Sequence, residues 1–439
     1  MLRLLIGCIW ILMLAVLMLA DQGGDSESGG SRLIELLKIA SRLSAIGIVT
    51  TVLWCSREKI VQSSLTARFL PWALFAAWAV FSIAWSALRS TSLSQSLSLV
   101  ILLMLSCCIA IQTRRIAHVS QILMHLCLAM LVISTVVLAA RFVAPDTFSL
   151  SRNAKGSFHP TNAAATAGLA IVVITVSTLL FNWRWARWLI APSLLVHGAT
   201  LVLANNRASL MVTTIVIVFA VLWGAAPQAR WLLVTCGCLA LAGYLVADPA
   251  LRGAGGVSDR LAAYLAREQS TQELAALSGR EEMWTVMWKS FQGSPWIGHG
   301  YFVSSATGQL KVWYVWSNWT AHNFWLQILV GTGIVGAGLM ALGLLSYIVQ
   351  LVRAWSLPTG SHNVACLGAL VLLWQCGWGL TNESFAGPLQ AESIAFFAVL
   401  GLVIGRIVHA EARANERGEA AYSPLGSPAF RHVLATESI

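Results

Sequence analysis

Long apolar runs, separated by short polar or charged segments, make up most of the chain. Each run is about 20 residues long, which suits an α-helix that crosses a bilayer, and none shows the alternation of a transmembrane β-strand. The first run is expected to stay in the protein rather than be cleaved as a signal peptide, because it is long and many further runs follow. The pattern predicts about twelve membrane-spanning helices, near residues 2–20, 33–55, 69–88, 92–112, 118–142, 161–182, 186–204, 208–225, 231–247, 322–352, 363–381 and 389–408.

The composition indicates the same class of protein. Of the 439 residues, 57% are hydrophobic and 10% are charged, whereas a soluble domain has about 25% charged residues. The nine cysteines lie in or at the ends of apolar runs, so neither a disulfide framework nor a zinc site is expected. We therefore expect an all-α, polytopic membrane protein.

Basic residues in the short loops predict the orientation of the chain. When the spans are counted in alternation, the loops at 56–59, 113–115 and 183–187 share one face with Arg230 and Arg353. An excess of Lys and Arg marks the cytoplasmic side of a membrane protein. The opposite face is therefore expected to lie outside the cytoplasm, on the periplasmic side.

This orientation divides the chain into four parts. Residues 1–247 hold transmembrane helices one to nine, residues 248–321 form a large periplasmic loop with short helices, residues 322–408 hold helices ten to twelve, and residues 409–439 form a cytoplasmic tail that is expected to be disordered. Within the loop, residues 257–269 and 278–293 are typical of amphipathic helices. The aromatic face of the second helix, with Trp284 and Trp288, is expected to anchor it to the membrane surface.

Basic residues also gather on the predicted exterior face, where the topology rule does not require them. The net charge of the chain is +10. Either a bound anionic ligand or lipid headgroups would explain such a face. The residues are Arg152, Lys155, Arg207, Arg252, Arg260, Arg267, Arg280, Lys289 and Lys311.

Three exterior segments carry candidate chemistry. Arg207 follows Asn206 in "ANNRASL", at a tight turn between two spans, where it either lines a polar pocket or snorkels to headgroups. Arg280 lies in the first turn of the helix in "SGREEMW", where it either faces that pocket or pairs with a neighbouring glutamate. His322 precedes Asn323 in "TAHNFW", at the mouth of a span, where it either takes part in a site or caps the helix.

Two further segments add candidates. "SRNAKGSFHPTN" places Arg152, Lys155 and His159 before a helix that begins near Pro160. The free N–H groups at the start of that helix suit an anion, so the segment is either a secondary phosphate contact or an ordinary loop. Glu383, in "TNESF", is an acid available to orient a base. The chain has no Asp-x-Asp pair that would hold a divalent ion against a pyrophosphate, so no metal is expected.

The exterior segments resemble the O-antigen ligase family. The residues that carry the resemblance are "GREEMW", "SPWIGHGYF" and "HNFWLQILVGTGIVG", together with the order of Arg207, Arg280 and His322 along the chain. The family consists of membrane glycosyltransferases and shares a superfamily with O-antigen polymerases and protein O-oligosaccharyltransferases. The topology of most of the chain fits the family, and the sharp motifs lie between residues 205 and 336.

The resemblance implies a reaction, its substrates and its location. The reaction is the metal-independent transfer of a glycan from undecaprenyl pyrophosphate to a sugar hydroxyl of lipid A-core in lipopolysaccharide biosynthesis, on the periplasmic side of the bacterial inner membrane. No cofactor and no nucleic-acid partner are expected, membrane lipids surround the protein, and the oligomeric state stays open.

The candidate residues suit that chemistry. A departing pyrophosphate needs fixed positive charge, and the planar guanidinium binds phosphate oxygens through two donors, so we expect Arg207 and Arg280 to stabilise it. An attacking hydroxyl needs a base, and histidine suits neutral pH, so we expect His322 to act as that base. The residues expected to bind the pyrophosphate or glycan are Arg152, Lys155, His159, Asn206, Asn323 and Glu383.

Other functions stay open. A polymerase or a protein O-oligosaccharyltransferase would use the same residues with a different acceptor. A transporter or flippase is less favoured, because the basic residues and His322 gather on one face and few ionisable groups cross the membrane. Lys38 and Arg42, about one helical turn apart in the second run, are exceptions that either face the bundle or snorkel.

Overall fold

The computed structural model describes residues 1–18, 29–56, 64–113, 115–144, 156–181, 187–224, 280–308, 310–312, 316–318, 321–357, 361–383 and 389–416. This part of the chain is helical apart from one short antiparallel pair, β1 (Leu310–Val312) with β2 (Trp316–Asn318). The α-helices are α1 (Leu2–Met18), α2 (Gly29–Cys55), α4 (Leu65–Phe81), α5 (Arg89–Gln112), α6 (Ile116–Val143), α7 (Pro160–Phe181), α8 (Arg187–Leu203), α9 (Arg207–Gly224), α13 (Arg280–Gly293), α14 (Phe324–Ser356), α15 (Ser361–Gly379) and α16 (Ala391–Glu416). Two 3₁₀ turns, η2 (Ser82–Ala84) and η3 (Gly156–Phe158), precede α5 and α7.

The helices confirm a multi-pass, helical membrane protein. Each expected span coincides with a described helix, except the span near 231–247, which lies outside the described residues. Within the described ranges, six helices are long and apolar enough to cross a membrane, and the total of twelve spans stays a prediction. The six are Leu65–Ala84, Arg89–Gln112, Ile116–Val143, Pro160–Phe181, Phe324–Ser356 and Ala391–Ala414.

The extramembrane segments differ in detail from the expectation. The expected helix at 257–269 lies outside the described residues, whereas α13 forms where the second amphipathic helix was predicted. The strands β1 and β2 were not predicted from the apolar pattern. α16 continues past the expected boundary at residue 408 to Glu416, because Glu411 lies 2.6 Å from the buried Arg68 of α4 and ties this turn to the bundle.

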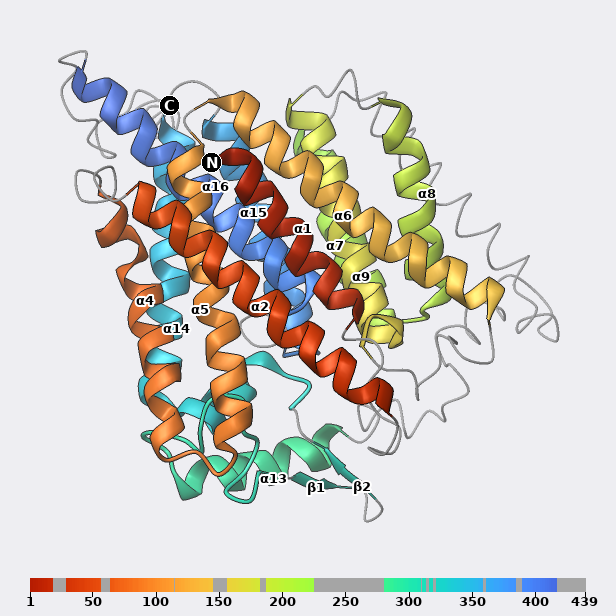
Figure 1. Ribbon diagram of the computed structural model, residues 1–439, viewed down its shortest axis with the longest axis vertical. Coiled ribbons are helices and arrows are strands. Elements are labelled where there is room, and N and C mark those ends of the chain that lie inside the picture. Colours follow the sequence, from red (N-terminus) through yellow and green to blue (C-terminus); the bar gives the residue numbers. More distant parts are fainter. Residues whose placement is uncertain are drawn as a thin grey trace, which may run out of the picture.

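The helix α13 crosses one end of the bundle, next to β1 and β2, and the N-terminus lies at the opposite end (Figure 1). α13 packs on α14 and β1, and its Met283, Met287 and Phe291 are buried against Val330 and Leu310. The expectation that this face lies on the membrane was therefore wrong for the buried residues and for Trp284, because they cover the protein's own α14 and the segment before it. Trp288 contacts the edge of that core, with its ring centre 5.1 Å from that of Phe291, but it is 49% exposed, and its role as a membrane anchor stays a prediction.

A break at Gly333 divides α14. The backbone at Gly333 leaves the helix, with φ 68° and ψ −171°, a conformation that favours glycine because it has no Cβ. Residues 294–302, which follow α13, fill the gap and pair with the groups that the break frees. The backbone N–H donors and carbonyl acceptors are His299 to Val330, Gly300 to Gly331, Ile334 to Pro295 and Val335 to Trp296.

These bonds give the segment 294–302, which contains Gly298 and Gly300, a structural role. Unpaired backbone groups inside a membrane are costly, so a broken helix needs partners from another part of the protein. The indole of Trp78 in α4 adds a further bond, donating to the carbonyl of Thr332 over 3.0 Å. The segment 294–302 therefore joins α13 to α14 and α4, and it fixes the position of the extramembrane helix relative to the bundle.

Replacing Gly333 by alanine is expected to destabilise the protein. A new Cβ would lie 2.2 Å from the carbonyl oxygen of Trp296, and the positive φ adds strain. We expect Gly333→Ala to lower the free energy of unfolding by at least about 2 kcal/mol, read as a lower Tm in detergent. Gly338→Ala is the matched control, because a Cβ there meets nothing within 4 Å in the same helix. Equal Tm values for the two variants would contradict this account of the break.

The structure shows which way Arg42, in the second expected span, is directed. Arg42 of α2 donates to the hydroxyl of Ser94 in α5 over 2.9 Å, so it faces the bundle rather than the headgroups. The side chain of Lys38 lies outside the described set.

Candidate active site

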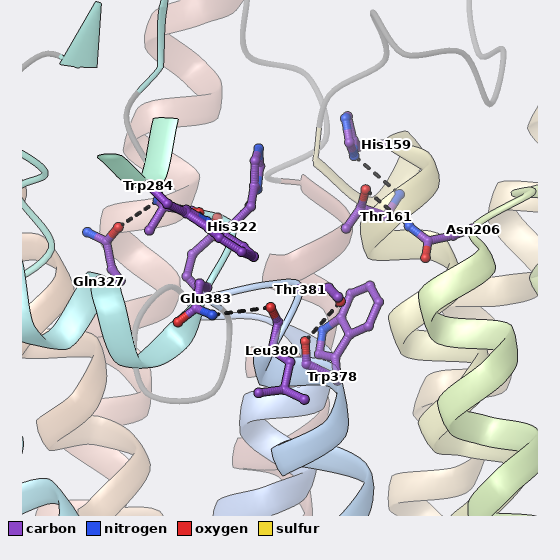
Figure 2. Close-up of polar contacts among 12 residues, drawn as sticks. His159, Thr161, Asn206, Trp284, His322, Gln327, Trp378, Leu380, Thr381 and Glu383 are labelled. Atoms are coloured by element: carbon purple, nitrogen blue, oxygen red, sulfur yellow. Dashed lines mark hydrogen bonds and ion pairs between the residues drawn. The ribbon is translucent and has the colours of Figure 1, made fainter. Parts of the chain in front are cut away.

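Polar side chains from several helices gather at the end of the bundle where α13 lies. One group surrounds His322, at the start of α14, and another surrounds Asn206, at the start of α9 (Figure 2). The helix α15 packs against α7, α9 and α14, and the residues that follow it lie between the two groups in Figure 2. The two groups come from positions more than a hundred residues apart in the chain.

His322 and Glu383 form the centre of the first group. The Nδ1 atom of His322 lies 3.4 Å from Oε2 of Glu383, with 36% of the histidine and 13% of the glutamate side chain exposed. A carboxylate beside Nδ1 favours a proton on that nitrogen and leaves Nε2 as the basic atom. The imidazole is therefore partly exposed to solvent and has an acid beside it.

The backbone around His322 is held in an uncommon conformation. His322 has φ 46°, in the left-handed region that costs a residue with a side chain about 1–2 kcal/mol. Just before it, the carbonyl of Ala321 accepts a bond from the indole of Trp284 over 2.8 Å, and its N–H donates to the buried amide oxygen of Gln327 over 2.9 Å. Both backbone groups of Ala321 are thus fixed, one by α13 and one by α14.

Asn323 fixes the other side of His322. Its side-chain oxygen accepts from the N–H of Leu326 over 3.0 Å and so caps α14, while its amide donates to the carbonyl of Leu380 over 3.3 Å. This second bond joins the start of α14 to the segment that carries Glu383. Asn323, expected to bind substrate, is therefore a helix cap in this structure, and a role in substrate binding stays a prediction.

Arg280, the first residue of α13, is brought into the same group. Burial lowers the pKa of Arg280, and the negative charge of Glu383 raises it. The carboxylate that faces His322 therefore also acts on Arg280. Glu281 and Glu282, the neighbouring acids that were an alternative partner, have exposed side chains.

The second group begins at the turn between α8 and α9. Asn205 has φ 47°, and the side-chain oxygen of Asn206 accepts from the N–H of Ser209 over 3.0 Å, which caps α9. The amide of Asn206 lies 3.4 Å from the hydroxyl of Thr161 in α7. Arg207 is the first residue of α9, so its charge adds to the positive end of the helix dipole and suits an anion there.

The segment before α7 reaches this group in part. The Nδ1 atom of His159 accepts from the N–H of Thr161 over 3.2 Å, so this ring caps the start of α7. Arg152 and Lys155 lie outside the described residues. In the described ranges, no group of three His, Cys, Asp or Glu side chains could hold a metal ion, and metal independence of the reaction stays a prediction.

Sequence reasoning missed three residues that shape the site. Trp284 was assigned to the membrane, and Gln327 and Thr161 were not considered. The signal for Trp284 was its position one turn after Arg280 on α13, which puts both side chains on one face of the helix. Gln327, five residues after His322 in an apolar span, was the other visible signal, because a buried amide needs a partner.

Fold and site together define a multi-pass helical membrane protein with His, Glu and Arg side chains gathered at one end of the bundle. The O-antigen ligase family model matches residues 192–341. The match covers Arg207, Arg280 and His322, confirms the resemblance to O-antigen ligases, and supports a likeness to the O-antigen ligase and polymerase superfamily. No relative matches among curated proteins.

Trp284 is expected to position His322. In Trp284→Phe the ring remains but the bond to Ala321 is lost, so we expect turnover in the glycan transfer proposed below to fall about 10-fold to 100-fold, the scale of small misplacements. Donor affinity and Tm are expected to change little. Trp288→Phe, on the same helix with an exposed ring, is the control. A parallel loss in both variants, or a loss explained by a lower Tm, would argue against positioning.

Proposed function

We propose that this protein is a membrane glycosyltransferase that transfers a glycan from undecaprenyl pyrophosphate to a sugar hydroxyl of lipid A-core, on the periplasmic side of the bacterial inner membrane. The observation that carries the proposal is that one carboxylate, Glu383, faces His322 and acts electrostatically on Arg280. A base and a cation beside one carboxylate suit an acid–base transfer with an anionic leaving group. The family match supports a glycosyltransferase-like enzyme.

The proposed reaction begins with the acceptor hydroxyl. Glu383 holds the proton on Nδ1 of His322, and Nε2 removes the proton from the hydroxyl as its oxygen attacks the anomeric carbon. The 3.4 Å separation from Glu383 shortens when the imidazole becomes charged, because the ion pair then strengthens. The bond from the anomeric carbon to the pyrophosphate oxygen breaks, and the electron pair leaves with the pyrophosphate.

The leaving group gains negative charge, which needs a cationic environment. Arg280 feels the charge of the same Glu383 that faces His322, and Arg207 lies at the positive end of α9. Each guanidinium offers paired donors to phosphate oxygens, and its partial removal from water strengthens the attraction. His159, Asn206 and Asn323 border this space, and with Arg152 and Lys155 they remain proposed contacts to the donor.

A related transfer is the alternative. A polymerase or a protein O-oligosaccharyltransferase would use the same base and arginines, and it would differ only in the acceptor. Purified protein is therefore incubated with undecaprenyl-linked glycan and with lipid A-core, a second copy of the lipid-linked glycan, or an acceptor protein. A product on lipid A-core alone supports the ligase assignment. A product on the lipid-linked glycan would instead identify a polymerase, and a product on the acceptor protein would identify a protein O-oligosaccharyltransferase.

The base is tested by His322→Ala. We expect turnover to fall about 100-fold to 10,000-fold with little change in donor affinity, since proton removal matters in the transition state. Glu383→Gln is expected to keep the fold but to lower turnover, because a neutral amide no longer stabilises the imidazolium. His362→Ala, at the opposite end of α15, is the control. Near-normal turnover of His322→Ala would remove the base assignment.

Metal removal gives a separate test. The proposed mechanism relies on arginines for charge stabilisation, so transfer is expected to continue at an unchanged rate in EDTA. Arg280→Lys would then recover only part of the activity lost in Arg280→Ala, because an ammonium lacks the paired donors. Activity abolished by EDTA and restored by magnesium or manganese would overturn the arginine mechanism.

A further inference from the structure

A polar pocket lies between α1 and α6, with the first residues of α1 in its lining. The N-terminus lies at the end of the bundle opposite α13 (Figure 1). Its volume is about 470 Å³. It is open toward the outside of the bundle, where the lining residue Met1 is 43% exposed. Its lining consists of Met1, Leu2, Arg3, Ile6, Gln121, Met124 and His125.

The protonation of His125 follows from its partner. The indole nitrogen of Trp10 lies 3.2 Å from Nδ1 of His125. An indole N–H can only donate, so Nδ1 accepts and the ring proton lies on Nε2. The imidazole therefore offers one N–H donor that Trp10 does not use, and His125 borders the pocket with this ring.

The polar lining favours an anion. Arg3 brings a positive charge and several N–H donors, and Gln121 brings an amide one helical turn before His125 on the same face of α6. No Asp or Glu is among the residues that line the pocket. A phosphate group, which carries charge and offers only acceptors at neutral pH, matches Arg3 and Gln121.

The apolar lining selects between the sources of phosphate. Leu2, Ile6 and Met124 offer surface that a free phosphate ion does not use but an acyl chain does. A phospholipid also carries ester carbonyls below its phosphate, which suit a second donor such as the Nε2–H of His125. The leaflet at this end of the bundle is the predicted cytoplasmic one, whose anionic lipids attract basic residues.

We propose that this pocket binds one anionic phospholipid of the phosphatidylglycerol class. The phosphate lies against Arg3 and Gln121, an ester carbonyl accepts from His125, and an acyl chain follows Ile6 and Met124. The lipid joins α1 to α6 at the end of the bundle opposite the candidate active site. This site is independent of the proposed glycosyltransferase function.

The test uses the full-length protein in detergent micelles that contain either phosphatidylglycerol or phosphatidylcholine with identical acyl chains. Native mass spectrometry measures the fraction of protein that retains a lipid. We expect one retained phosphatidylglycerol and little retained phosphatidylcholine. In Arg3→Gln we expect the affinity for phosphatidylglycerol to fall at least about tenfold, the scale of one charge-assisted hydrogen bond. Gln121 is exposed, so Gln121→Leu removes the amide without opening a cavity in the core, and it is expected to lower the affinity in the same direction.

Arg353→Gln is the matched control, because it removes the same charge from an exposed position at the end of α14, outside the pocket. It is expected to retain phosphatidylglycerol like the unmodified protein. Equal retention of both lipids, or an equal loss in Arg353→Gln and Arg3→Gln, would overturn the proposal and indicate unspecific lipid around the bundle. Displacement of the lipid by excess inorganic phosphate would also overturn it, by identifying a site for small anions.

Discussion

The break at Gly333 is the constraint on which the arrangement of the site depends. A helix inside a membrane cannot leave backbone groups unpaired, so the N–H and carbonyl groups that the break in α14 frees need partners. Residues 294–302 supply them, and through this segment α13 is joined directly to α14. The position of Arg280, at the far end of α13, is therefore tied to that of His322, at the start of α14. A hydrogen-bonding requirement in one helix thus organises two candidate functional residues.

The second organising feature is the shared carboxylate. Glu383 follows α15, yet it faces His322 and acts on Arg280. The strained backbone of His322 fits this picture, because the bonds to Ala321 and Asn323 hold it in place. Such over-determined strain is common where a side chain must keep one orientation.

The amphipathic face of α13 and two asparagines illustrate how a sequence pattern can indicate the right element and the wrong surroundings. The amphipathic face of α13 was recognised, but it packs on α14 rather than on lipid, because both surfaces are apolar and the pattern does not distinguish them. Asn206 and Asn323 were recognised as polar residues at the mouths of spans. Each caps a helix through its side-chain oxygen, a role that uses the same atoms as substrate binding.

The sequence by itself determined the helical membrane class, the positions of most spans, and the residue types of the site, because apolar length and charge asymmetry are properties of local segments. It also indicated Arg207, Arg280, His322 and Glu383 as candidates. Only the tertiary structure decided that Glu383 faces His322 and acts electrostatically on Arg280, and that residues 294–302 close the break in α14. Those contacts join segments far apart in the chain, and their geometry follows from how helices pack rather than from any local pattern.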